Sequence, residues 1–195
     1  MNDPRPLYAR AVAQFAALVA TVEQDQLDRP TPCAEFDVRA LLDHVLMVTD
    51  HLAHVGEAGD WLTAPEWTRQ VADDGWPAAF EEKRVRAIGV WADDARLAGE
   101  VSVPWGKVSG TAALGGYVLE TVTHTWDLSR ALGNPLPLDQ ELAEGLLPLA
   151  RGFIGAEHRG GEIPFGPVRE VPEDADAYDR LAGWLGREVP FTAAG

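Results

Sequence analysis

The stretch Leu119-Glu120-Thr121-Val122-Thr123-His124-Thr125-Trp126-Asp127-Leu128 places a carboxylate and an imidazole four residues apart in an otherwise apolar run. Four residues are just over one helical turn, so in a helix the side chains of Glu120 and His124 leave the same face. A second face of this helix is also apolar and carries Val118, Val122 and Trp126. A helix that is apolar on both sides belongs in the centre of a bundle, so we expect Glu120 and His124 to lie inside the protein.

An acid and a histidine on a buried face need a compensating interaction, because their desolvation is costly, and a shared metal ion provides one. The Glu-x-x-x-His spacing alone is weak evidence, since such a pair also occurs as a simple surface pair. His44 strengthens the metal hypothesis: it follows Leu41 by three residues and precedes Val48 by four, so it points to the buried side of another predicted helix. Two imidazoles and one carboxylate suit zinc, nickel, iron or manganese, and they leave a coordination position open for water or substrate.

Apolar residues at helical spacing predict further helices around this stretch. The predicted helices cover residues 7–22, 37–56, 77–99, 111–132, 140–153 and 174–185. Asp37 is a suitable N-cap for the second of them, and Gly133-Asn134 marks the end of the fourth. We expect an extended connector at residues 101–106 and a loop at residues 160–167. Four long helices with small additions predict an all-α fold, a four-helix bundle with short extra helices and minor extended segments, as a single domain over residues 1–195.

Charge and cysteine content narrow the class of protein. The formal net charge of −15 argues against a nucleic acid or an anionic membrane as partner, because such partners require clustered Lys and Arg. The single cysteine, Cys33, excludes an internal disulfide, and the N-terminus shows no secretory signal pattern, so we expect a cytoplasmic protein. No apolar run approaches the ~20 residues needed to cross a bilayer.

Other polar residues are candidates for lesser roles. Asp127 follows His124 by one turn and is expected either to orient that ring as a hydrogen-bond acceptor or to face water. His51 lies two turns after His44, a rise of ~10 Å, which is too far for both rings to bind one ion. We interpret His51 and His54 as polar residues outside the first ligand set. Cys33 is interpreted as a packed loop residue in preference to an activated thiol.

Two motifs together resemble a known family. They are Arg29-Pro-Thr-Pro-Cys-Ala-Glu-Phe-Asp-Val-Arg-Ala-Leu-Leu-Asp-His44 and Glu120-x-x-x-His124-Thr-Trp-Asp-Leu-Ser-Arg-Ala-Leu-Gly133. The chain resembles the DinB-like metal-binding proteins related to the N-terminal domain of mycothiol-dependent maleylpyruvate isomerase. Residues 165–172 and 179–187 are similar to the tail of a single-domain branch of that group. The likeness spans nearly the whole chain.

The resemblance implies a four-helix bundle with a divalent metal, usually zinc or nickel, at His44, Glu120 and His124. It also implies chemistry on a low-molecular-weight thiol such as mycothiol or bacillithiol, together with an electrophile. The isomerase carries a further C-terminal domain that helps form its active site, and this chain is too short to contain one, which counts against maleylpyruvate isomerisation itself.

Three functions stay open from the sequence. The first is a metal-dependent thiol transferase or related isomerase. The second is hydrolysis by a water molecule bound at the metal, assisted by an acid such as Asp127. The third is a protein that binds a metal or ligand without catalysis. A homodimer formed through an exposed helix face is compatible with each of them.

Overall fold

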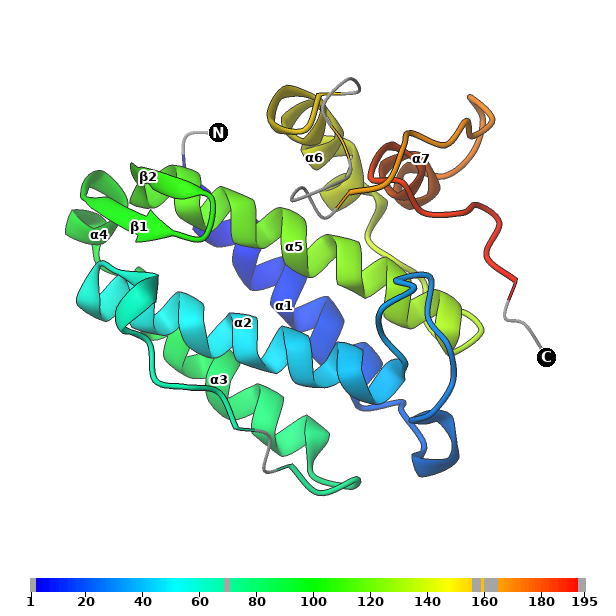
Figure 1. The fold of residues 1–195 in the computed structure, drawn as a ribbon, viewed down its shortest axis with the longest axis horizontal. Helices are drawn as coiled ribbons and strands as arrows, with labels where there is room; N and C mark the ends of the chain where they lie inside the picture. Colours follow the sequence, from blue (N-terminus) through cyan, green and yellow to red (C-terminus); the bar gives the residue numbers. More distant parts are fainter. Residues whose placement is uncertain (1–2, 69–70, 156–158, 160–164, 193–195) are drawn as a thin grey trace.

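The computed structural model describes residues 3–68, 71–155, 159 and 165–192 (Figure 1). In this part of the chain seven α-helices and one two-stranded antiparallel hairpin form. The helices are α1 Arg5–Val19, α2 Val38–Ala58, α3 Trp76–Trp91, α4 Asp94–Ala98, α5 Gly110–Ala131, α6 Gln140–Phe153 and α7 Ala177–Trp184. The hairpin strands are β1 Glu100–Val103 and β2 Gly106–Ser109, and short 3-10 turns occupy Gln24–Gln26 and Trp61–Thr63.

Four of the helices form a bundle. Helices α1 and α2 each pack against both α3 and α5, which closes a ring of four, while α6 and α7 pack against each other and against α5. Figure 1 shows α6 and α7 together on one side of α5, away from α3. The predicted all-α four-helix bundle with short extra helices and minor extended segments is therefore confirmed.

Some helix boundaries differ from the prediction, for local physical reasons. The expected helix over residues 77–99 is two helices, because Asp93 caps a new one by accepting a hydrogen bond from Ala95 N (2.9 Å). Helix α2 passes Gly56 and ends at Ala58. Gly56 serves packing instead, since a Cβ there would lie 2.9 Å from the Trp91 ring nitrogen on α3.

Two other boundaries follow the prediction. The N-cap at Asp37 is confirmed by the hydrogen bond from Ala40 N to its carboxylate (2.7 Å). The connector at residues 101–106 is extended, as expected, but it forms one strand and the turn of the hairpin. Residues 160–164 of the expected loop lie outside the described residues.

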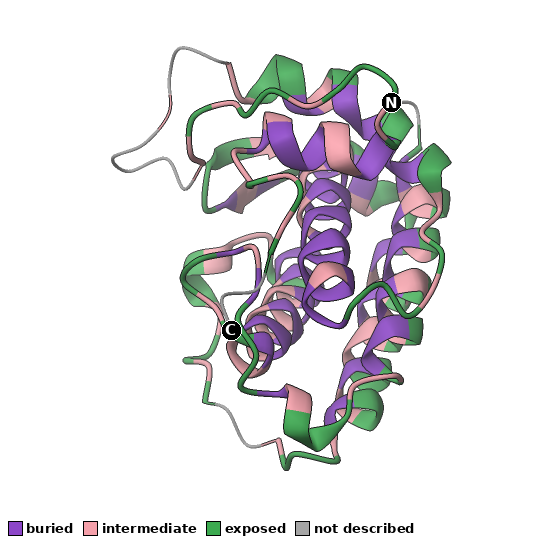
Figure 2. Ribbon diagram, turned by 90° about the vertical axis from the view of Figure 1, so that its right-hand side faces the viewer, coloured by how far each residue is buried: buried purple, intermediate pink, exposed green. Residues whose placement is uncertain are grey.

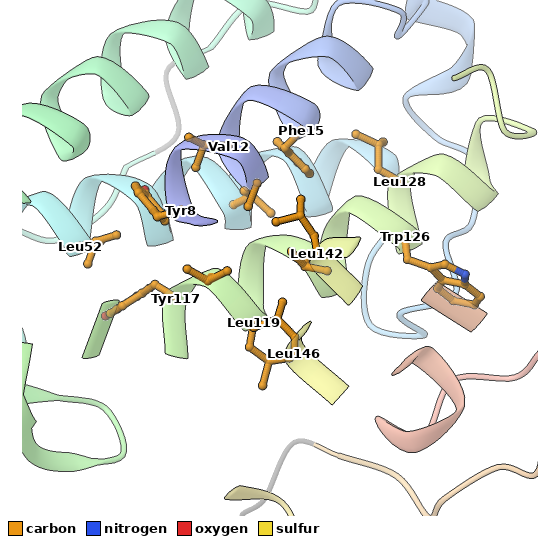
Figure 3. Close-up of a cluster of buried hydrophobic side chains, with 14 of the residues drawn as sticks. Tyr8, Val12, Phe15, Leu52, Tyr117, Leu119, Trp126, Leu128, Leu142 and Leu146 are labelled. Atoms are coloured by element: carbon orange, nitrogen blue, oxygen red, sulfur yellow. The ribbon is translucent and has the colours of Figure 1, made fainter. Parts of the chain in front are cut away.

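Helix α5 lies at the centre of the fold. Most of its residues are buried, and the hydroxyls of Thr121, Thr123 and Thr125 satisfy themselves by donating to carbonyls one turn earlier (2.7–2.9 Å). Figure 2 shows buried residues on the inward faces of the helices and exposed residues on the outside. In Figure 3 the large apolar side chains of α1, α5 and α6 meet around this helix. No helix within the described ranges combines the length and apolar character needed to span a membrane.

The core contact of α5 yields a stability prediction. Leu128 is fully buried, so Leu128→Ala removes packed methyl groups and leaves a cavity, and it should lower the free energy of unfolding by about 2–5 kcal/mol. The matched control is Leu62→Ala, whose side chain is 70% exposed and whose loss should change stability by no more than about 0.5 kcal/mol. Urea unfolding followed by circular dichroism measures both. Equal effects of the two substitutions would contradict this packing.

Candidate metal centre

Helices α2 and α5 bring the three predicted ligands to one point. Nε2 of His44 on α2 lies 2.8 Å from Oε1 of Glu120 on α5, and Nε2 of His124 lies 3.1 Å from the same oxygen. One donor atom from each residue lies within 4.8 Å of the other two. His124 is almost fully buried, with 6% of its side chain exposed, whereas the side chains of His44 and Glu120 are 24% and 33% exposed. The cluster is thus buried at His124 and partly open to solvent at His44 and Glu120.

The donor set fits a divalent metal ion. Zinc forms bonds of about 2.0–2.2 Å to imidazole nitrogen and carboxylate oxygen, which places neighbouring donors about 3.4 Å apart in a tetrahedron. The distances between Glu120 and the two rings are a few tenths of an ångström shorter than this, as expected of hydrogen bonds between the same groups. The three donors lie within 4.8 Å of one another, so side-chain movements of about 1 Å would bring two nitrogens and one oxygen to the spacing of a ligand set.

Asp127 lies where an orienting acceptor belongs. Its Oδ2 is 3.0 Å from Nδ1 of His124, so the ring has one nitrogen at Asp127 and the other at Glu120. Asp127 is completely buried, and it is also held by the guanidinium of Arg187 through contacts of 2.9 and 3.0 Å. Of the two alternatives open from the sequence, exposure to water is excluded. A catalytic role for Asp127 stays a prediction.

The pKa values of the cluster follow from its contacts. Burial opposes the charged form of His124, but the Glu120 charge and the hydrogen bonds to Asp127 and Glu120 outweigh it and raise the pKa from 6.5 to about 9. Burial raises the pKa of Glu120, yet the charge of His124 and hydrogen bonds from His124 and His44 lower it more, so the pKa lies well below its usual range. For Asp127, burial is likewise outweighed by hydrogen bonds from His124 and Arg187, and the pKa is lowered.

His51, His54 and Cys33 stay outside this cluster. Among the described residues, the group of donors that could hold a metal contains only His44, Glu120 and His124. His54 contacts the hydroxyl of Thr63 at 2.9 Å, and Nε2 of His51 is buried without a hydrogen-bond partner among the described residues. Cys33 is buried, and burial raises the pKa of its thiol, which matches its interpretation as a packed loop residue.

The sequence did not point to two residues at the centre. The ring of Phe36 lies 4.9 Å from the His44 ring and 6.2 Å from the His124 ring, so it forms an apolar wall beside both imidazoles. Phe36 belongs to the loop before α2, where periodicity carries no information. Arg187 is 60 residues from Asp127 along the chain, and only the folded structure brings the two together.

The family model of the mycothiol maleylpyruvate isomerase N-terminal domain matches residues 8–129 of the sequence, which include all three candidate ligands. The chain belongs to this family. The family assignment agrees with the resemblance seen in the sequence. Two relatives of similar length are the uncharacterized proteins MT0763 and Rv0738 of two Mycobacterium tuberculosis strains. Each is 34% identical to this chain over 187 residues, covering 96% of this chain and 99% of its own.

Two solved structures share the fold of this family member. A mutant of the mycothiol-dependent maleylpyruvate isomerase superposes with a TM-score of 0.58 and 13% identity, covering 75% of this chain and 67% of its own. A DinB-like protein from Bacillus subtilis superposes with a TM-score of 0.55 and 16% identity, covering 69% of this chain and 95% of its own. At these identities the likeness establishes the DinB-like bundle and no more.

Removal of a candidate ligand tests the cluster directly. In His44→Ala or His124→Ala the bound metal per chain should fall sharply. Changes to residues behind metal ligands already cost about 10–100-fold in affinity, and loss of a ligand costs more. The matched control is His54→Ala, a histidine on the same helix as His44 that contacts Thr63 instead. Elemental analysis after dialysis measures the stoichiometry, and wild-type metal content in both ligand variants would remove the site.

The raised pKa of His124 gives a pH prediction. Below a pH of about 9 His124 is an imidazolium in the metal-free protein, with a proton on each ring nitrogen. A metal ion that binds Nε2 must displace the proton on that nitrogen. Because binding releases this proton, metal affinity should rise about tenfold for each pH unit up to a pH of about 9. Above that pH, His124 contributes no further rise. Calorimetric titration with Zn²⁺ in buffers of different ionisation enthalpy counts the released protons. No proton release from this ring at pH 7 would contradict the paired, protonated state.

Proposed function

We propose that this chain is one metal-binding domain over residues 1–195 and that it works as a metal-dependent enzyme on a low-molecular-weight thiol, as an S-transferase or isomerase. His44, Glu120 and His124 are the proposed ligands, and zinc or nickel is the proposed ion, because imidazole nitrogen with one carboxylate suits both. The observation that carries the proposal is the convergence of these three donors, from two helices, within 4.8 Å of one another. A divalent ion held by His44, Glu120 and His124 would lower the pKa of a bound thiol and so favour its thiolate form at neutral pH.

The side chains around the centre divide it into a holding side and a reacting side. On the holding side, His124 and Asp127 are buried and joined by a hydrogen bond, so the His124 ring would be held in a fixed orientation toward a bound ion. Glu120 and His44 are partly exposed, so a small molecule reaches the centre from their side. Three protein donors leave room for such a ligand, and an open site of this kind is typical of catalysis more than of structural support.

Phe36 shapes the reacting side. Its ring centroid lies 4.9 Å from that of His44 and 6.2 Å from that of His124, so both imidazoles have an apolar neighbour. A weakly hydrated anion such as a thiolate gains from a partly apolar environment next to a cation, because the attraction between them is stronger there. Phe36 therefore favours a sulfur ligand over a strongly hydrated oxygen ligand.

Family membership supports a thiol as the partner. The family takes its description from the N-terminal domain of mycothiol maleylpyruvate isomerase, and the matched residues include the three candidate ligands. We extend this to a mycothiol-type thiol as the proposed cosubstrate of this chain, with an electrophilic small molecule as second substrate.

A stability measurement combined with turnover tests the proposal. Mycothiol or bacillithiol should raise the melting temperature of the Zn²⁺-loaded protein, because a ligand that prefers the folded state stabilises it. The same thiol should give no shift in Glu120→Gln loaded under identical conditions, since that variant lacks the carboxylate ligand. With an electrophile panel, consumption of the thiol, or thiol-dependent conversion of the electrophile, supports a transferase or isomerase.

Other outcomes separate the remaining functions. Turnover of esters or amides without added thiol would instead indicate hydrolysis. A metal-dependent thiol shift without turnover of any substrate would indicate a binding protein. Absence of any thiol shift in the metal-loaded protein would contradict the proposal.

A further inference from the structure

Arg187 holds Asp127 at two points. Its Nε lies 2.9 Å from Oδ1 and its Nη2 lies 3.0 Å from Oδ2 of that carboxylate. Asp127 is fully buried, and only 12% of the Arg187 side chain is exposed. A planar guanidinium that binds both carboxylate oxygens fixes the position and the plane of the carboxylate, which a single contact cannot do.

The contact extends to the candidate metal centre through one shared atom. Oδ2 of Asp127 lies within hydrogen-bond distance of both Arg187 and Nδ1 of His124 (3.0 Å each). Because Nδ1 is engaged by the carboxylate, Nε2 is the ring nitrogen directed to Glu120 and the candidate ion position. The orientation of the His124 ring therefore depends on where Arg187 holds Asp127.

The backbone after α7 directs Arg187 to this place. Arg187 N donates to Ala182 O (3.0 Å), and Gly186 has a φ of +89°, which together close the helix with a left-handed glycine. A Cβ on Gly186 would lie 2.8 Å from the backbone of Gly166, so the turn is also packed against a second segment. Helix α7 itself contacts α5. The sequence Gly186-Arg187 thus fixes the direction in which the chain leaves the helix.

We propose that Arg187 is a positioning residue of the metal centre, whose two-point contact with Asp127 fixes the carboxylate that orients His124. This inference rests on the metal binding in the proposed function and extends it to a new part of the chain. Residues 8–129 match the family domain, and Arg187 lies beyond them. The C-terminal segment therefore completes the centre that α2 and α5 begin.

Cobalt(II) is the probe, because both its affinity and its visible absorption report on the ligand geometry. We compare the wild type with Arg187→Gln, Arg187→Lys and the control Arg169→Gln. Arg169 pairs with Glu188 at 2.6 Å in the same C-terminal segment, where the two side chains are 44% and 69% exposed. Arg187→Gln should weaken Co²⁺ binding about 10–100-fold and change the spectrum, as expected for a partner behind a ligand. Arg187→Lys, which keeps the charge but not the fork, should lie between, and Arg169→Gln should match the wild type.

A double-variant cycle tests whether Arg187 acts through Asp127. If it does, Asp127→Asn and Arg187→Gln should not be additive in Co²⁺ affinity, because each breaks the same chain of contacts. A purely structural role would lower the melting temperature and leave the affinity and the cobalt spectrum unchanged. Additive losses of affinity would contradict action through Asp127.

The outcomes are separable. Wild-type affinity and spectrum in both Arg187 variants would overturn the positioning role while leaving the metal centre in place. If Arg187→Gln does not fold, as judged by far-UV circular dichroism, the conservative Arg187→Lys decides alone, and wild-type behaviour there contradicts the two-point contact. Failure of the wild type itself to bind Co²⁺ or Zn²⁺ would contradict the proposed metal centre and this inference with it.

Discussion

Desolvation of charged side chains at the contact between α2 and α5 is the constraint on which the structure depends. A chain of polar contacts, buried at His124 and Asp127, joins five residues, which are His44, Glu120, His124, Asp127 and Arg187. An unpaired charge in such a place is strongly destabilising, and in this chain of contacts each acid faces at least one cationic or hydrogen-bonding partner. The pairing requires α2, α5 and the segment after α7 to meet in one arrangement. The surrounding apolar core supplies stability, and the polar chain fixes how the elements are placed.

Local sequence patterns predicted the part of this arrangement that depends on helical geometry. Glu120 and His124 share a face because they are four residues apart, and His44 was found because its phase on α2 agrees with Leu41 and Val48. The apolar period continues through the break before α4, so periodicity alone does not predict it, whereas the N-cap at Asp93 marks it.

The long-range part of the site could not be predicted in this way. Phe36 lies in a loop without periodicity, and Arg187 reaches Asp127 across 60 residues of sequence. Such contacts depend on how whole elements pack. The family match over residues 8–129 includes the candidate ligands His44, Glu120 and His124, whereas Arg187 lies beyond it.

In the proposed site three side chains from two helices bind one metal ion. Crystals of Zn²⁺-loaded protein, measured above and below the zinc absorption edge, test it most directly. We expect one anomalous peak within about 2.0–2.2 Å of Nε2 of His44, a carboxylate oxygen of Glu120 and Nε2 of His124. A peak at other residues, or none at this position in metal-loaded crystals, would contradict it.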